Sequence, residues 1–185
     1  MVRRQGPRPG GRSARVQASV HTATRDLLGQ FDRAEITVPM IASKAGVTPS
    51  TIYRRWGDLG DLLADVAVEH LRPDTEPADT GEAQRDLLAW AEQYADEMSS
   101  APGQEMLRDV LAASGSTGAQ QCCTFTRDQI TLIARRAASR GEAFPDPEAV
   151  IDGVVSPILF RILFAESLDP ERIQELVSRI MKDHR

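Results

Sequence analysis

The chain has 185 residues, of which 41% are hydrophobic and 26% are charged. This length suits one or two small domains with an apolar core, and the composition is ordinary for a globular protein. No apolar run approaches the roughly 18 residues that span a bilayer, and no apolar signal-peptide segment follows the basic N-terminus. We therefore expect a cytoplasmic protein with no membrane partner.

The charges are distributed unevenly along the chain. Residues 1–57 hold ten Lys or Arg and three acids, a net charge of +7, whereas the other 128 residues hold twelve and twenty-four, a net charge of −12. A basic head on an acidic body indicates that one end meets a polyanion.

The first segments in chain order are an arm and a helix. Residues 1–12 contain four arginines, two prolines and three glycines, which predicts a disordered basic arm. From Ser13 onward, apolar residues recur at helical spacing up to Phe31. These residues are Val16, Val20, Ala23, Leu27 and Phe31.

Three shorter helices are predicted next. Thr37 is the expected N-cap of a helix over 38–45, which ends at Gly46. A third helix takes Thr48 as N-cap and Pro49 as first residue, and runs to about Trp56. A fourth begins near residue 58 and is closed by the proline at 73.

Residues 72–81 break the composition and mark the predicted domain boundary, giving domains over 13–72 and 73–185. The body then predicts helices over about 82–100, 102–113 and 119–140, with a Ser/Gly-rich loop at 113–119. Asp146-Pro147-Glu148 and Asp169-Pro170-Glu171 are start signals for two further helices. The total is about nine helices and no strand, which is an all-α fold.

The segment 37–56 carries the pattern of a helix-turn-helix. Two crossing helices need a small residue at the crossing point, which Ala42 supplies, and a turn of positive φ, which Gly46 supplies. Ile41, Val47 and Ile52 are spaced to share one small core. The exposed face of the third helix is then left to hydroxyl and guanidinium groups that suit phosphates and base edges in a major groove. These residues are Pro49, Ser50, Thr51, Tyr53, Arg54 and Arg55. A merely solvated helix is the alternative.

The run Ile41-Ala42…Ala45-Gly46-Val47-Thr48…Thr51-Ile52-Tyr53-Arg54-Arg55-Trp56…Leu62-Leu63 resembles the N-terminal signature of the TetR (tetracycline repressor) family over about residues 15–63. The resemblance implies a homodimeric, all-helical repressor whose three-helix DNA-binding head sits on a body that binds a small effector.

By position, the resemblance also implies roles for individual residues. It implies that phosphates are contacted by Thr37, Thr48, Thr51 and Tyr53. It also implies positions in or beside the groove for Lys44, Pro49, Ser50 and Arg54. Gly60 departs from the family, which usually has a lysine there. The arm, with Arg3, Arg4, Arg8 and Arg12, is a hypothetical minor-groove contact.

A protein that recognises a twofold-symmetric operator, which is an inverted repeat in double-stranded DNA, needs two heads held about one helical turn apart. The last two helices carry apolar stripes that a four-helix bundle between two subunits would cover. The predicted dimer residues are Ile151, Val154, Val155, Ile158, Ile162, Ile173, Val177 and Ile180. Some of them are alternatively plain intrachain core, and Pro157 predicts a kink in the first of the two helices.

Aromatic and methionine side chains of the body predict a mainly neutral, apolar effector pocket. The candidates are Trp90, Tyr94, Met98, Met106, Phe125, Gln129 and Phe160, each of which is alternatively plain core. The adjacent Cys122 and Cys123 are interpreted as two buried thiols, with a redox switch as the alternative.

The sequence also bears on three other functions. The three histidines lie on separate predicted helices, and no metal-ligand spacing, phosphate loop or nucleophile motif accompanies them, so we expect no enzyme, metal or cofactor. A helical protein-interaction module that has lost DNA binding would not require the basic arm or Arg54-Arg55. The sequence does not distinguish a repressor from an activator.

Overall fold

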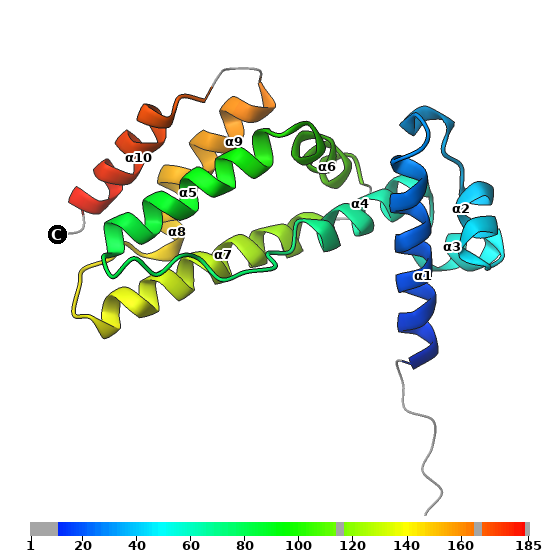
Figure 1. The fold of residues 1–185 in the computed structure, drawn as a ribbon, viewed down its shortest axis with the longest axis horizontal. Coiled ribbons are helices and arrows are strands. Elements are labelled where there is room, and N and C mark those ends of the chain that lie inside the picture. The colour runs from blue at the N-terminus through cyan, green and yellow to red at the C-terminus, as the bar shows by residue number, and fades with distance from the viewer. Residues whose placement is uncertain (1–10, 114–116, 165–167, 184–185) are drawn as a thin grey trace, which may run out of the picture. The chain divides into compact units, whose positions relative to one another are not determined.

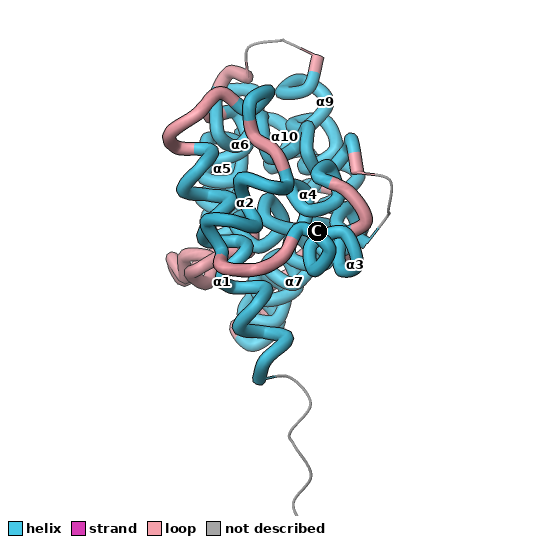
Figure 2. The backbone as a smooth tube through the Cα atoms, turned by 90° about the vertical axis from the view of Figure 1, so that its right-hand side faces the viewer, coloured by secondary structure: helices cyan, strands magenta, loops and turns pink. Residues whose placement is uncertain are grey.

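The computed structural model describes residues 11–113, 117–164 and 168–183, and every regular element in these ranges is a helix (Figure 2). If α8, η2 and α9, which follow one another without a break, are counted as one helix, these ranges hold nine α-helices and one short 3₁₀ turn. The predicted all-α fold of about nine helices is confirmed.

The chain divides into two compact units, which meet between Val66 and Ala67. This division falls inside helix α4 (Leu59–His70), before the boundary that was predicted at residue 72. Ala67 and Val68 are buried in a cluster with Val110 of the second unit, so the last turn of α4 belongs to the body. The composition break at 72–81 marks the connection that follows α4 and not the edge of the first core.

The first unit, here called the head, holds α1 (Gly11–Leu28), η1 (Arg33–Glu35), α2 (Val38–Ala45), α3 (Pro49–Trp56) and the start of α4. Helix α1 begins at Gly11, earlier than predicted, and ends before Phe31, which is 45% exposed. The buried residues of the head form one core, as the helical spacing predicted. Its members are Val20, Ala23, Leu27, Ile36, Val38, Ile41, Ala42, Ile52, Trp56, Leu62 and Val66.

The second unit, the body, holds α5 (Ala83–Ser99), α6 (Ala101–Ala112), α7 (Thr117–Ser139), α8 (Pro147–Val150), η2 (Ile151–Val155), α9 (Ser156–Leu163) and α10 (Pro170–Lys182). Helix α5 is its centre and packs on α6, α7, α9 and α10 (Figure 1). Helix α7 begins at Thr117, inside the segment 113–119 that was predicted to be a loop.

Both Asp-Pro-Glu start signals are confirmed. The Asp146 carboxylate accepts a hydrogen bond from the Glu148 backbone N–H at 2.9 Å, and the Asp169 carboxylate accepts one from Glu171 at 3.0 Å. Each caps a helix whose first residue is proline, where a missing N–H costs nothing because that group has no partner within the helix.

The region before Pro157 adopts a π turn. Residues Ile151–Val155 are π-helical, and the backbone N–H of Ser156 donates to the carbonyl of Ile151 five residues earlier. The Ser156 hydroxyl donates to the same carbonyl at 2.9 Å. The wider turn is the local adjustment that the structure makes next to a proline that cannot donate.

The predicted dimer residues are mostly core residues of a single subunit. Six of the eight are buried within the chain itself, so they have no surface left for a partner, and Ile151 and Ile180 are half-buried against the same core. The six are Val154, Val155, Ile158, Ile162, Ile173 and Val177. For these six the alternative of plain intrachain core describes the single subunit, because the strongest apolar stripe of an amphipathic helix marks the face turned to its own core.

A buried carboxylate holds the connection that precedes α5. Asp86 is fully buried, and one of its oxygens accepts hydrogen bonds from the Thr80 backbone N–H (2.6 Å) and the Thr80 hydroxyl (2.7 Å). The Arg140 guanidinium donates to its other oxygen at 2.8 Å. Burial by itself would raise the pKa of Asp86, but the hydrogen bonds from Thr80 and Arg140 lower it below its usual value.

Among the described residues, no helix combines the length and apolar character needed to cross a membrane. The same residues contain no group of three or more His, Cys, Asp or Glu side chains that could hold a metal ion. Cys122 is half-buried but Cys123 is exposed, so the expectation of two buried thiols was wrong for Cys123.

Candidate DNA-binding face and ligand pocket

The turn between α2 and α3 has the geometry that the helix-turn-helix pattern predicts. Thr37 caps α2, and Gly46 ends it in the left-handed region at φ 69°. The Val47 backbone N–H then donates to the Ala42 carbonyl at 3.0 Å. Ile41, Ala42 and Ile52 are all buried, so the turn fixes α3 against α2 through a packed core.

Hydroxyl groups gather at the beginning of α3. Thr48 occupies the N-cap position without a side-chain cap hydrogen bond, and its hydroxyl oxygen lies 2.9 Å from those of both Ser50 and Thr51. Thr48, Pro49 and Ser50 are exposed. Pro49 has no N–H, and the Thr51 N–H donates to the Thr48 carbonyl at 2.9 Å. The Ser50 backbone N–H and a hydroxyl of this group can therefore donate to an anionic oxygen such as a phosphate.

Tyr53 and Arg54 are the unengaged members of the α3 face. The Tyr53 side chain is 50% exposed, and Arg54 is exposed with no hydrogen bond or ion pair among the described residues. A phenol and a guanidinium group that have no partner in the protein are available for base edges and phosphates.

Arg55 and Lys44 are both engaged inside the head, which their sequence positions did not reveal. The Arg55 guanidinium donates to the Ser13 carbonyl (2.8 Å) and to the Gln17 side chain (2.8 Å), and it lies over the Trp56 ring. Arg55 thus ties α3 to α1 and is a structural residue of the head. The Lys44 ammonium lies 3.4 Å from the Asp26 carboxylate in an exposed ion pair.

The Asp65 carboxylate on α4 joins three helices, and sequence reasoning missed it. The same oxygen accepts hydrogen bonds from the Trp56 indole at 2.7 Å and from Gln17 at 3.3 Å, and it lies 2.9 Å from Nε2 of the buried His21. The hydrogen bond with His21 lowers the pKa of Asp65, burial opposes this, and the bond from Trp56 lowers it further. Asp65 is the one acid within the otherwise apolar run 62–68 of α4, and this was the available signal.

The arm contacts were predicted for Arg3, Arg4 and Arg8, which lie outside the described residues. Arg12 lies inside them, in the first turn of α1, and is exposed. Gly60, where the family pattern expects lysine, is exposed in the first turn of α4.

A pocket of about 330 Å³ opens in the body between α5, α6, α7 and the connection that follows α4. Six of the seven side chains predicted to bind an effector line it: Trp90, Tyr94, Met98, Met106, Phe125 and Gln129. Phe160 does not, because it is 59% exposed on α9, where its ring lies 4.8 Å from that of Phe164. The exposed position of Phe160 overturns its assignment to the pocket.

The pocket is less uniformly neutral than predicted. Its entrance includes the exposed charged residues Arg72, Asp74, Glu76 and Glu97, which were not foreseen because they lie on the connection and on the polar face of α5. The lining residues that are buried or half-buried are all uncharged. Burial raises the pKa of the Tyr94 phenol well above its usual value and that of the Cys122 thiol to about 11, so both keep their protons at neutral pH.

The head therefore defines a helix-turn-helix DNA-binding regulator. Family comparison agrees: residues 21–66 match the model of bacterial regulatory proteins of the tetR family, and residues 77–180 match the tetracyclin repressor-like C-terminal domain. The chain belongs to the TetR family, whose members are transcription regulators and not enzymes.

The individual relatives have low sequence identity to this chain. The HTH-type transcriptional regulator Rv1556 of Mycobacterium tuberculosis is 26% identical over 168 residues, covering 86% of this chain and 81% of the relative. AqdR of Rhodococcus erythropolis, also an HTH-type transcriptional regulator, is 27% identical over 111 residues, covering 60% of this chain and 54% of AqdR.

Solved structures share the fold. The TetR family transcription regulator SCO0332 superposes with a TM-score of 0.67 at 24% identity, covering 90% of this chain and 97% of its own. The TetR family repressor AlkX from Dietzia sp., implicated in biodegradation of n-alkanes, superposes with a TM-score of 0.60 at 15% identity, covering 96% and 97%.

Proposed function

We propose that the protein is a cytoplasmic, homodimeric repressor that binds an inverted repeat through α3 of each subunit and is released by a small molecule bound in the body. The observation that carries the DNA-binding part is the exposed face of α3. Arg54 and Tyr53 lie there without a partner in the described chain, beside the hydroxyls of Thr48, Ser50 and Thr51. A guanidinium group in this position can bind a guanine edge with two hydrogen bonds.

Release by a ligand rests on the pocket. A concave site whose buried and half-buried lining is uncharged, and which is made entirely of body residues, suits a small effector. A ligand that binds one conformation more tightly than the other shifts the population toward it. Release follows if the favoured conformation holds the two heads at the wrong separation for successive major grooves, about 34 Å apart. The description of AlkX as a repressor supports the same direction of control.

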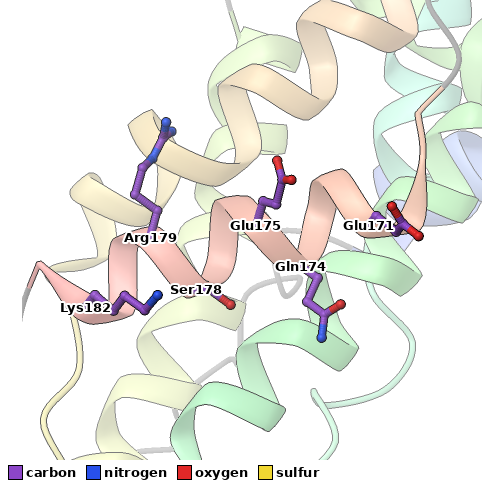
Figure 3. Close-up of a pocket in the computed structure, with 6 residues that line it drawn as sticks. All are labelled: Glu171, Gln174, Glu175, Ser178, Arg179 and Lys182. Atoms are coloured by element: carbon purple, nitrogen blue, oxygen red, sulfur yellow. The ribbon is translucent and has the colours of Figure 1, made fainter.

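The exposed faces of α9 and α10 support a dimer through these helices. Phe160, Leu163 and Phe164 are large apolar side chains of this region that remain exposed in one subunit. Along α10, a shallow surface depression is lined by Glu171 and Glu175 toward the N-terminus and by Arg179 and Lys182 toward the C-terminus (Figure 3). Two copies of this helix packed antiparallel about a twofold axis place acids against bases in both directions.

Selection of bound sequences from a random oligonucleotide pool tests DNA recognition. The wild-type protein should recover an inverted repeat at physiological salt. Arg54→Ala should lose discrimination at one base pair of each half-site by about tenfold, since one bidentate base contact contributes about 1–3 kcal/mol. Arg55→Ala is the matched control: it removes the same charge from the next residue, and it should destabilise the head while leaving the recovered motif unchanged.

Recovery of no motif by a protein free of bound ligand would contradict DNA recognition and favour a protein-interaction module. An unchanged motif for Arg54→Ala together with an altered one for Arg55→Ala would contradict the assignment of these two residues.

Charge exchange tests the dimer surface. The double variant Glu171→Lys/Glu175→Lys makes this face of α10 wholly basic, and Arg179→Glu/Lys182→Glu makes it wholly acidic. Each should dissociate as a homodimer at low salt, and the two should form a heterodimer when mixed, as measured by sedimentation velocity. Homodimers of unchanged stability for both variants would contradict antiparallel pairing of α10.

A further inference from the structure

The deep part of the body pocket offers an aromatic surface and no ion. Trp90 and Met98 are largely buried there, with relative exposures of 7% and 6%. Trp90 and Tyr94 stack with ring centroids 5.3 Å apart and an interplanar angle of 23°. Phe125 and Met106 from the neighbouring helices also line the pocket. Flat rings and thioethers of this kind favour a flat, polarizable ligand over a branched aliphatic one.

The lining residues that are half-buried and can hydrogen bond are all uncharged, namely Tyr94, Cys122, Thr126 and Gln129. The Gln129 amide nitrogen donates to the Thr75 carbonyl at 3.4 Å, and its own carbonyl oxygen accepts no hydrogen bond among the described residues. The Tyr94 and Thr126 hydroxyls also line the pocket, and the Tyr94 phenol keeps its proton because burial raises its pKa. The lining therefore presents an acceptor at Gln129 and hydroxyl donors at Tyr94 and Thr126.

The charged groups at the entrance are already compensated or solvated. Glu76 accepts a hydrogen bond from Arg136 at 2.6 Å, and Glu97 accepts one from Gln93 at 2.8 Å. Arg72 and Asp74 are exposed and opposite in charge. None of them can replace the hydration that an ion would lose by moving into the deep part of the pocket, which is a large cost without a paired partner.

We infer that the pocket takes an uncharged, flat aromatic ligand that carries one hydrogen-bond donor and one acceptor, such as an aromatic amide. This inference rests on the proposed function, because it names the class of effector for the same site. The donor of the ligand meets the Gln129 carbonyl, its acceptor meets the Tyr94 and Thr126 hydroxyls, and its ring continues the Trp90–Tyr94 stack. The volume of about 330 Å³ is at the low end for small-molecule sites, which limits the ligand to a few fused rings.

Four probes of one shape test the inference by calorimetry on the full-length protein. They are 2-naphthamide, naphthalene, 2-naphthoate and 2-naphthylmethylammonium. The amide should bind at least about tenfold more tightly than the anion and the cation, because only these two leave an unpaired charge in the pocket. It should exceed naphthalene by about threefold to tenfold, the contribution of one or two hydrogen bonds.

The two tyrosines of the chain supply matched variants. Tyr94→Phe removes one hydroxyl from the pocket and should lower 2-naphthamide affinity by about threefold to tenfold with naphthalene unaffected. Tyr53→Phe removes one hydroxyl from α3 and should leave all four affinities unchanged. Gln129→Leu should act like Tyr94→Phe.

Tighter binding of the anion or the cation, equal binding of all four probes, or binding of none would overturn the inference. The oligonucleotide selection is independent of these results. If it recovers an inverted repeat while the probes fail, the ligand class is wrong and DNA recognition stands. If 2-naphthamide binds as expected while no motif is recovered, the ligand class stands and the proposed regulator does not.

Discussion

The head and the body use the same residue types in opposite ways. Each unit holds one tryptophan and one tyrosine. In the head, the Trp56 indole donates to a carboxylate and Tyr53 projects into solvent, whereas in the body Trp90 stacks on Tyr94 beside a pocket. The head presents exposed donors that have no partner in the described chain, whereas the body presents stacked rings around a pocket. Charge patterning therefore drew attention to the head, and aromatic content drew attention to the pocket of the body.

Each unit also contains a carboxylate that accepts several hydrogen bonds, and the two carboxylates differ in the elements that they connect. Asp65 in the head contacts side chains of α1 and α3 from α4, and so fixes the position of α3. Asp86 in the body fixes a connection and the beginning of α5. In both cases the pKa is lowered, so each carboxylate stabilises the folded protein in its ionised form. Substitution of Asp65 should therefore affect the head, and substitution of Asp86 should affect the body.

The largest effect is expected from Gly103→Ala in the body. A β-carbon at Gly103 would overlap the Glu97 carbonyl oxygen and lie 3.0 Å from the Met98 Cα, so α5 and α6 would have to separate. We expect a loss of about 3 kcal/mol in the free energy of unfolding of the body, measured by denaturant titration. Gly29→Ala in the head is the control, since its β-carbon would make only ordinary contacts, and it should change stability by less than about 0.5 kcal/mol. Equal effects would contradict the close approach of α5 and α6.

Asp86→Asn should destabilise the body by about 2 kcal/mol, because it removes the charge that faces the Arg140 guanidinium while it keeps the shape of the side chain. The folded pKa of Asp86 is lowered, so its contribution is present above the unfolded pKa of about 4 and is lost as the pH falls through the folded pKa. Wild-type stability should therefore drop on acidification below about pH 4, and the variant should show a shallower drop. Parallel pH profiles for the two proteins would refute this role.

Asp65→Asn should destabilise the head by about 1–2 kcal/mol, because a neutral amide oxygen accepts weaker hydrogen bonds from Trp56 and Gln17 than an ionised carboxylate does. In a Trp90→Phe background, the fluorescence of Trp56 alone reports unfolding of the head. We also expect weaker operator binding, because α3 loses a contact that orients it. Unchanged Trp56 emission and unchanged operator affinity would show that Asp65 does not position this helix.

Lys44→Ala is expected to give the smallest change in stability, below about 0.5 kcal/mol, because its ion pair with Asp26 is exposed. If Lys44 contacts a phosphate, the variant should reduce the slope of log affinity against log salt concentration by about 0.9. Asp26→Asn removes the same ion pair without removing a cation, and serves as the control. A slope that falls equally in both variants would exclude a phosphate contact by Lys44.

Local signals predicted most of the fold. The positive φ at Gly46 and the Asp-Pro-Glu caps depend on residues within one turn of the chain, and these were correct. Five of the six predicted residues that line the pocket are aromatic or methionine, which are the usual lining of a small-molecule site, and the sixth, Gln129, is one of the few polar groups expected beside them.

Two features that the sequence did not reveal depend on contacts between distant residues. Apolar spacing on α9 and α10 identified the faces toward their own core, and nothing in a periodic stripe tells a subunit core from a dimer interface. Arg55 and Arg54 are adjacent and identical, yet only Arg55 meets α1, because one residue along a helix turns a side chain by about 100°.

Because each helical residue turns the chain by about 100°, the π turn at Ile151–Val155 also determines which side chains of α9 are exposed. A π turn contains one residue more than the α-helical turn it replaces, so it acts as a one-residue insertion that advances the phase of everything after it. With this phase Ile158 and Ile162 face inward and Phe160 and Phe164 remain outside. Deleting a single residue from the turn would rotate α9 by about 100° relative to α8. Phe160 and Phe164 would then leave their present exposed side. The residues of the π turn therefore determine which surface α9 presents to a partner, although they do not belong to that surface.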